Sequence, residues 1–225
     1  MKKYILVGCA LAGLAFGVGS AMAADAPVAT SYDWSGPYVG IIADYGWANS
    51  QHCDGICDGA AFGPAVSSKG FGAGLELGYN FQMDNLVFGV EGDYSLANIN
   101  GSSPSTPTYG CSTGCETDIN GYGSFRARLG FAADNVMPYI TGGVGVINVN
   151  ASLGGIGAST TMVEPVIGGG LEFGISENVS IKAEYLHFFN TSQVFDFSPL
   201  DCVTPGCSVR DVSLDTVRVG LNLSF

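Results

Sequence analysis

The chain has 225 residues and a formal net charge of −12 at pH 7, with 20 acidic and eight basic residues. This acidic balance argues against binding to nucleic acid, which needs a basic face to meet phosphates. Mean hydropathy is positive at +0.30, but beyond the first 23 residues no apolar run is long enough for a membrane-spanning helix. The hydrophobic residues are instead dispersed, which is typical of strands that show them at every second position.

The N-terminus has the pattern of a secretory signal peptide. A lysine pair precedes an apolar run at 4–19, and Ala21-Met22-Ala23 forms a small-x-small cleavage motif. We therefore expect a signal peptide at 1–23, cleaved between Ala23 and Ala24. A lipoprotein motif ending at Cys9 is disfavoured, because the apolar run continues well past that cysteine.

After a lead-in at 24–36, expected in the periplasm, the chain alternates apolar and polar residues between turns. The predicted strands are 37–47, 70–81, 86–96, 119–132, 137–147, 162–175, 179–189 and 215–225. Three connections are short and rich in Asp, Asn and Ser, whereas the others are long: 48–69, 97–118, 148–161 and 190–214. This sorting of short turns from long loops is typical of outer-membrane barrels. The sequence predicts an all-β fold, an eight-stranded antiparallel up-and-down transmembrane β-barrel over 37–225.

Charged residues on the predicted strands fall on the face opposite the large hydrophobic residues. In the segment 86–96, for example, Phe88 and Val90 oppose Glu91 and Asp93. A basic residue facing lipid near the bilayer midplane costs about 2–4 kcal/mol, so the charges are expected inside. The interior of an eight-stranded barrel is just wide enough for side chains, which predicts a buried ionic network. Its expected members are Asp44, Glu76, Glu91, Asp93, Arg126, Arg128, Glu172, Lys182, Glu184 and Arg218.

Two features of the strands complete this prediction. Aromatic residues near strand ends are expected in interfacial girdles. They are Trp34, Tyr38, Tyr45, Trp47, Tyr94, Tyr139, Phe188 and Phe189. The segment 137–147 shows no clear preference for either face.

Several segments in order resemble the porin-family outer-membrane immunogenic proteins of alphaproteobacteria. The segments are Trp34-Ser-Gly-Pro-Tyr-Val-Gly40, Gly89-Val-Glu-Gly-Asp-Tyr94, Arg126-Ala-Arg-Leu-Gly-Phe131, Pro138-Tyr-Ile-Thr-Gly-Gly143 and Lys182-Ala-Glu-Tyr-Leu186. The resemblance implies a barrel like the OmpA transmembrane domain, exported to the cell outer membrane among its lipids and lipopolysaccharide, with both termini periplasmic. It also implies that the terminal Phe225 belongs to the signal read by the barrel-assembly machinery.

Six cysteines beyond the signal peptide depart from that family pattern. They form three local pairs in the predicted long loops: Cys53 and Cys57, Cys111 and Cys115, Cys202 and Cys207. An even number of cysteines in an exported protein favours disulfides, although six cysteines allow fifteen connectivities. A metal site at His52-Cys53-Asp54 is disfavoured because the other pairs lack a nearby histidine. No metal or cofactor is expected.

These patterns favour a non-enzymatic barrel with an envelope-structural and surface-contact role and long cysteine-bearing extracellular loops. The chain has two histidines, and neither lies in a catalytic motif, so no catalytic residue is expected. A narrow porin for ions or small solutes is the second hypothesis, and a surface receptor or adhesin contacting haem, a host or environmental ligands is the third. A lipocalin-like barrel would need hydrophobic residues facing inward, the reverse of the predicted pattern.

Overall fold

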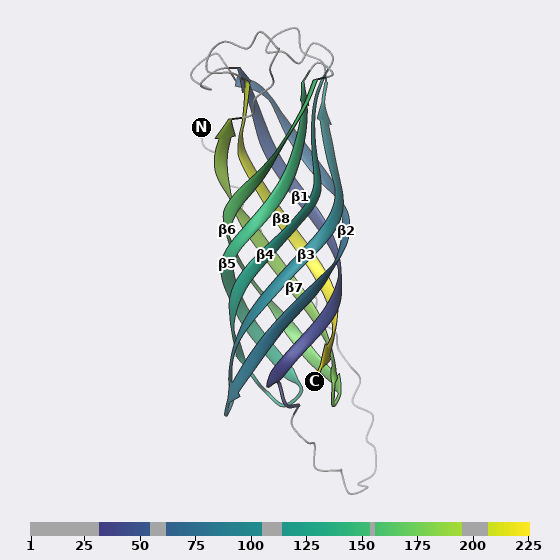
Figure 1. The fold of residues 1–225 in the computed structure, drawn as a ribbon, viewed down its shortest axis with the longest axis vertical. Coiled ribbons are helices and arrows are strands. Elements are labelled where there is room, and N and C mark those ends of the chain that lie inside the picture. The colour runs from purple at the N-terminus through teal and green to yellow at the C-terminus, as the bar shows by residue number, and fades with distance from the viewer. Residues whose placement is uncertain (1–31, 55–61, 105–113, 154–155, 195–206) are drawn as a thin grey trace, which may run out of the picture.

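The computed structural model describes residues 32–54, 62–104, 114–153, 156–194 and 207–225. Their eight strands are β1 (Gly36–Asp54), β2 (Phe62–Met83), β3 (Leu86–Ser103), β4 (Cys115–Phe131), β5 (Val136–Leu153), β6 (Ile156–Ser176), β7 (Val179–Val194) and β8 (Cys207–Ser224). Each strand pairs antiparallel with the next, and β8 pairs with β1, so the barrel is closed (Figure 1). In the described part of the chain no helix is long and apolar enough to cross a membrane.

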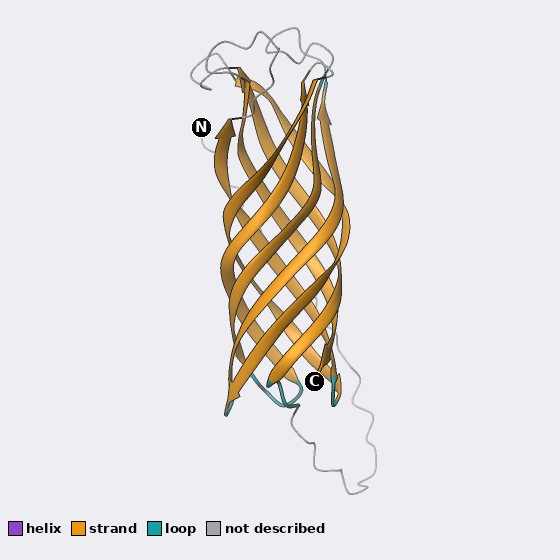
Figure 2. Cartoon of the chain, viewed as in Figure 1, coloured by secondary structure: helices purple, strands orange, loops and turns teal. Residues whose placement is uncertain are grey.

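Short turns join β2 to β3, β4 to β5 and β6 to β7 at the end of the barrel where the chain terminates (Figure 2). Asp84 and Asp134 lie in these turns with φ of 51° and 54°, a left-handed conformation that aspartate tolerates better than most residues. The Asn85 side-chain amide donates to the carbonyl of Ala132 at 2.8 Å, which ties two neighbouring turns together. The tight turns therefore lie where the sequence predicted them.

The strands are longer than the sequence analysis predicted. They run from 16 to 22 residues, whereas a tilted strand crosses a bilayer with about nine to eleven. The expected long loop at 148–161 is almost wholly strand, and Lys69, expected in a loop, lies on β2. These boundaries were wrong because the Asn, Ser and Gly residues there were interpreted as loop composition, although they still alternate with apolar residues.

The polarity of the alternation reverses along several strands, as β5 shows. Near the end with the short turns, which is expected to be periplasmic, the outward residues are apolar: Ile140 and Val144 are 66% and 53% exposed. Further along the same face Asn148 points outward, whereas Ile147 and Val149 are fully buried in the lumen. The barrel therefore has an apolar outer band where it crosses the membrane, and a polar outer surface above it.

The lumen is filled in three layers. The periplasmic plug is an apolar cluster of Tyr32, Trp34, Val87, Ala132, Met137 and Tyr139. Above it lies the ionic layer, made by the charged residues described below. The upper apolar layer fills the extracellular half with Ala48, Val66, Ile99, Cys115, Ile119, Tyr122, Ile147, Val149, Ala151, Met162, Val166, Leu186, Phe188, Val212 and Leu214.

This filling corrects half of the predicted aromatic girdle. Trp34, Tyr38, Tyr139 and Phe188 are buried inside the barrel. Tyr38 has the parity of the inward Asp44 on β1, and Tyr139 has that of the buried Met137 on β5. Their hydroxyls donate to Glu91 and Glu184 in the lumen, so both tyrosines belong to the lumen. The other four, Tyr45, Trp47, Tyr94 and Phe189, are on the outer surface.

Candidate functional site

Glu91 on β3 is the centre of the ionic layer. Its two oxygens accept from Lys182 Nζ at 3.0 and 2.9 Å, and Tyr38 OH donates to one of them at 2.5 Å. The Arg126 guanidinium also donates to this carboxylate, and Arg128 Nη1 lies 3.5 Å from it. One carboxylate is thus shared by three cations.

Arg126 and Arg218 form a second group with Asp93 and Glu184. Arg126 donates from Nη1 to Glu184 at 2.9 Å and from Nη2 to Asp93 at 3.2 Å. Arg218 Nη1 lies 3.0 Å from the other oxygen of Asp93 and 3.6 Å from Glu184. These four side chains come from β3, β4, β7 and β8, so the group bridges the lumen.

Arg128 is held by a third set of contacts. Its Nη2 donates to Glu172 at 2.5 Å, and its guanidinium lies 4.3 Å from the centre of the Tyr139 ring. The other oxygen of Glu172 accepts from Ser180 Oγ at 2.6 Å and from Asn222 Nδ2 at 3.0 Å. Partners of this kind offset the desolvation of buried charges.

The last two carboxylates, Glu76 and Asp44, have fewer cationic contacts. Glu76 lies 2.5 Å from Lys182 Nζ. Asp44 accepts from the hydroxyls of Ser95, at 2.7 Å, and Tyr122. The structure thus brings all ten residues of the predicted network together in the lumen, as six carboxylates and four cations.

Glycines on the inner faces give these long side chains their space. A Cβ built on Gly89 would lie 2.9 Å from Cγ of Arg128, and one on Gly220 would lie 3.0 Å from Cγ of Lys182. Larger residues at these positions would displace the cations from their partners. The sequence analysis did not identify the uncharged members of the layer, Tyr38, Tyr122, Tyr139, Ser180 and Asn222, although the two-residue repeat places each on an inward face.

The described end of the lead-in, residues 32–35, packs in the barrel mouth at the short-turn end. The Trp34 backbone N–H donates to the side-chain oxygen of Gln82 at 3.0 Å, and the Gln82 N–H donates to Ser35 Oγ at 3.3 Å. The Tyr32 ring lies 4.4 Å from that of Trp34, and both rings are buried against Met137. These contacts hold residues 32–35 at the barrel end.

The upper apolar layer closes the lumen on the other side of the charges. Tyr122 and Phe188 meet there edge to face, 5.7 Å apart, and both are fully buried. Leu186 and Ile119 belong to the same cluster. Glu164, which the sequence analysis did not single out, also lies buried at this level.

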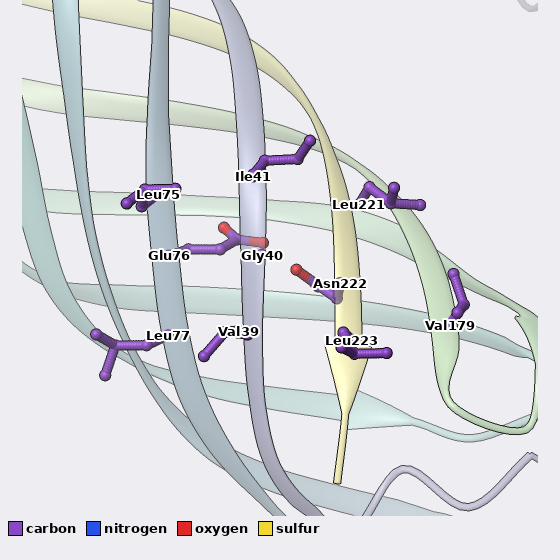
Figure 3. Close-up of a pocket in the computed structure, with 10 residues that line it drawn as sticks. All are labelled: Val39, Gly40, Ile41, Leu75, Glu76, Leu77, Val179, Leu221, Asn222 and Leu223. Carbon is purple, nitrogen blue, oxygen red and sulfur yellow. The ribbon is translucent and has the colours of Figure 1, made fainter.

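The outer surface at the level of the ionic layer is apolar. Figure 3 shows this surface where β8, β1 and β2 meet. The outward side chains Ile41, Leu75 and Leu221 are between 45% and 67% exposed, whereas Glu76 and Asn222 on the same strands are buried. This band has the chemistry of a surface that contacts lipid hydrocarbon.

The other predicted sites lie mostly outside the described side chains. Cys115, at the start of β4, is disulfide-bonded, but the side chains of Cys53, Cys57, Cys111, Cys202 and Cys207 are not described. The same holds for the disfavoured metal motif at His52 and for the cleavage site at Ala23 and Ala24. Phe225 is described: its ring is 71% exposed and its N–H donates to the Pro37 carbonyl at 3.1 Å.

A model of the outer membrane protein beta-barrel domain matches residues 11–225. The chain belongs to this family. Full-length relatives include the 31 kDa outer-membrane immunogenic protein of Brucella melitensis, 33% identical over all of both chains. The 25 kDa outer-membrane immunogenic protein of Brucella canis is 30% identical over all of this chain and 99% of that protein. The predicted resemblance is therefore confirmed.

Solved structures support the fold of this family member. Outer membrane protein OprG from Pseudomonas aeruginosa aligns with a TM-score of 0.53 at 14% identity, over 87% of this chain and all but 1% of that one. The predicted eight-stranded barrel is confirmed by the closed sheet of the structure. Membership of this family of outer-membrane proteins locates the protein in the cell outer membrane, in an environment of lipid and lipopolysaccharide.

Proposed function

We propose that this outer-membrane protein is a closed, non-enzymatic barrel with an envelope-structural and surface-contact role. The filled lumen carries the proposal. A solute crossing the barrel would have to displace the periplasmic plug, the ionic layer and the upper apolar layer in turn. Each layer is packed from side chains of several strands, so no single rotamer change opens a continuous path.

The arrangement of polar groups supports a non-enzymatic role. The charged side chains of the lumen are at most 4% exposed and contact one another, so a substrate has no access to them. His187 and Asp215 form an outward pair 2.7 Å apart, and Tyr185 OH donates to the same carboxylate oxygen at 2.5 Å. Trp47 lies beside this group, 6.4 Å from Tyr185, an aromatic arrangement that suits an interfacial anchor.

Surface contact would be made by the connections above the long strands. The strands that flank these connections extend beyond the apolar band, and along the chain the cysteines at 53–57, 111–115 and 202–207 lie in or beside the connections. We propose that these cysteines form disulfides that hold the shape of the loops. The names of the Brucella relatives, outer-membrane immunogenic proteins, support exposure of this end to a host or environmental ligands.

Conductance measurements on the mature protein in planar lipid bilayers test the closed lumen. We expect no reproducible current steps under conditions in which a general porin, inserted from the same detergent, conducts. Reproducible steps from the wild-type protein would favour the narrow porin instead. A heat-modifiable electrophoretic shift of the same preparation verifies that the inserted protein is folded.

We further propose that export follows the predicted signals. The signal peptide would be removed between Ala23 and Ala24, and Phe225 would act in recognition by the barrel-assembly machinery. The intact mass of protein from outer membranes should match a chain beginning at Ala24. Deletion of Phe225 should lower the folded yield in cells without lowering refolding in detergent, and equal losses in both would contradict a recognition role.

A further inference from the structure

The outer surface above the apolar band is rich in amides and hydroxyls. On the described strands its outward residues include Asn49, Ser67, Asn98, Asn100, Ser102, Asn148, Asn150, Ser152, Ser159 and Thr161. Some bond to each other across strands: Thr161 Oγ1 donates to Asn148 at 2.9 Å, and Ser67 Oγ donates to Asn49 at 3.0 Å. The result is a hydrogen-bonding surface on the outside of the barrel, and its outward charged residues include Lys69, Glu116 and Asp118.

A hollow lies in this surface over β4, β5 and β6. It is lined by Asp118, Asn150, Ala151, Ser152, Gly157, Ala158 and Ser159. The register places Asp118, Asn150 and Ser159 in one row across the three strands, with Ser152 and Gly157 paired in the row above. The space beside Gly157 is part of the hollow. The nearest atom to a Cβ built there is the Ala151 carbonyl oxygen at 4.0 Å, so a larger side chain at this position would extend into the hollow.

The height of the hollow determines what can reach it. The last outward apolar pair is Val146 and Val163, which face each other across β5 and β6. Asn150 is four residues further along β5, which is about 10 Å for a strand tilted near 40°. The interfacial region extends about 5–7 Å beyond each side of the hydrocarbon. The hollow thus lies just above the headgroups of the outer leaflet, with the row of Asn148 and Thr161 between it and the last outward apolar pair.

The chemistry of the hollow suits sugar hydroxyls better than phosphates. Among residues with described side chains, Lys69 is the one outward-facing cation of the strands, and it is on β2, away from the hollow. Phosphates are bound mainly by arginine and lysine, whereas the groups here are amide, hydroxyl and carboxylate. Partial burial and the neighbouring Glu116 carboxylate raise the pKa of Asp118, so hydroxyl donors from a ligand would stabilise its ionised form.

We propose that this hollow binds the neutral core sugars of lipopolysaccharide, with Asp118 and Asn150 as the main polar contacts. The proposal goes beyond the closed-lumen function and does not depend on it. It requires only that the barrel be in the outer membrane. Sugars attached to lipid in the leaflet that surrounds the barrel are delivered directly to the hollow, which favours them over free ligands.

Binding of defined lipopolysaccharides to the mature protein in detergent micelles tests this proposal. The probes are lipopolysaccharide with a complete core, deep-rough lipopolysaccharide with a truncated core, and lipid A alone. We expect complete-core material to bind at least tenfold more tightly than lipid A. The ratio should persist when salt is raised from 50 to 500 mM, because the sugar hydroxyls that meet Asp118 and Asn150 carry no charge that salt could screen. Equal affinity for lipid A, or loss of the ratio in high salt, would overturn the proposal.

A variant of the hollow and a matched control complete the experiment. The triple variant D118A/N150A/S159A removes the row of polar groups that includes both main contacts, and we expect its preference for the complete core to fall about tenfold. S176A removes an exposed hydroxyl at the periplasmic end of β6 and should bind like the wild type. The heat-modifiable shift verifies that each variant is folded, and a folded triple variant with wild-type preference would refute the site.

Discussion

Glu91 and Glu76 provide a matched test of the ionic layer, because both carboxylates are 2% exposed but differ in their partners. Glu91 contacts Arg126, Arg128 and Lys182, whereas the ion pair of Glu76 in the described network is with Lys182. The substitutions E91Q and E76Q each remove one charge without creating a cavity. Any difference between the two variants therefore reports the partners and not the volume or the burial.

The expected magnitudes follow from these contacts. E91Q leaves three buried cations facing a neutral amide, and breaking a buried ion pair from one side costs about 3–5 kcal/mol. The layer has six carboxylates and four cations, so E76Q removes a negative charge that is in excess. Lys182 keeps its contacts with both oxygens of Glu91. We therefore expect E76Q to change the free energy of unfolding by less than about 1 kcal/mol, the net value of a typical single hydrogen bond.

Urea titration of the protein folded in lipid vesicles measures both variants, with fluorescence of the two tryptophans as the signal. For an m value of about 2–3 kcal/mol/M, a loss of 3–5 kcal/mol lowers the midpoint by about 1–2 M. E76Q should remain within about 0.5 M of the wild type by the same conversion. Equal losses in the two variants would show that the layer acts as undifferentiated charge, and would refute the assignment of Glu91 as its centre.

Three further predictions concern the other parts of the barrel. L75R places a cation on the lipid-facing band, where Leu75 is 67% exposed. It should destabilise the barrel by about 2–4 kcal/mol in the same titration. An unchanged midpoint would mean that β2 does not face lipid there. W34A removes the largest side chain of the periplasmic plug and should cost about 3–5 kcal/mol, whereas a loss below 1 kcal/mol would indicate that the lead-in does not pack in the mouth. Unboiled mature protein should migrate differently from boiled protein in electrophoresis, and identical mobility would contradict the closed barrel.

The membrane-crossing half of the barrel was predictable because lipid imposes a single rule on every strand. Charges such as Glu91, Arg126 and Arg218 must face the lumen if the opposite residues face hydrocarbon, so parity alone gives their orientation. Parity does not give their partners. Arg126 contacts Asp93 and Glu184, 33 and 58 residues away along the chain, and that choice depends on the stagger of strands around the closed barrel.

The sequence analysis missed the upper parts of the strands because the apolar residues there change from the outward to the inward face. Along β5, Asn148 lies on the face that carries Ile140 and Val144 nearer the periplasm, so the apolar residues change faces without any change in the strand. A search for one constant pattern ends the strand at that point. The inward apolar run Ile147, Val149 and Ala151 was the signal that β5 continues. Tyr38 was assigned to a girdle for a related reason, because residue type was given more weight than its parity with Asp44.

The charge network also constrains how the barrel assembles. Arg218 is on the last strand and reaches Asp93 on β3, 125 residues earlier, across a seam where β8 pairs with β1. A shift of one residue at that seam would turn every side chain of β8 to the other face and place Arg218 in lipid. An open sheet would likewise lose the ion pairs that cross the lumen, such as Arg126 with Glu184 and Arg218 with Asp93. The full set of ion pairs thus forms only in the correctly closed barrel. Barrels with a shifted register would lack some of these pairs and would be destabilised before they reach the surface.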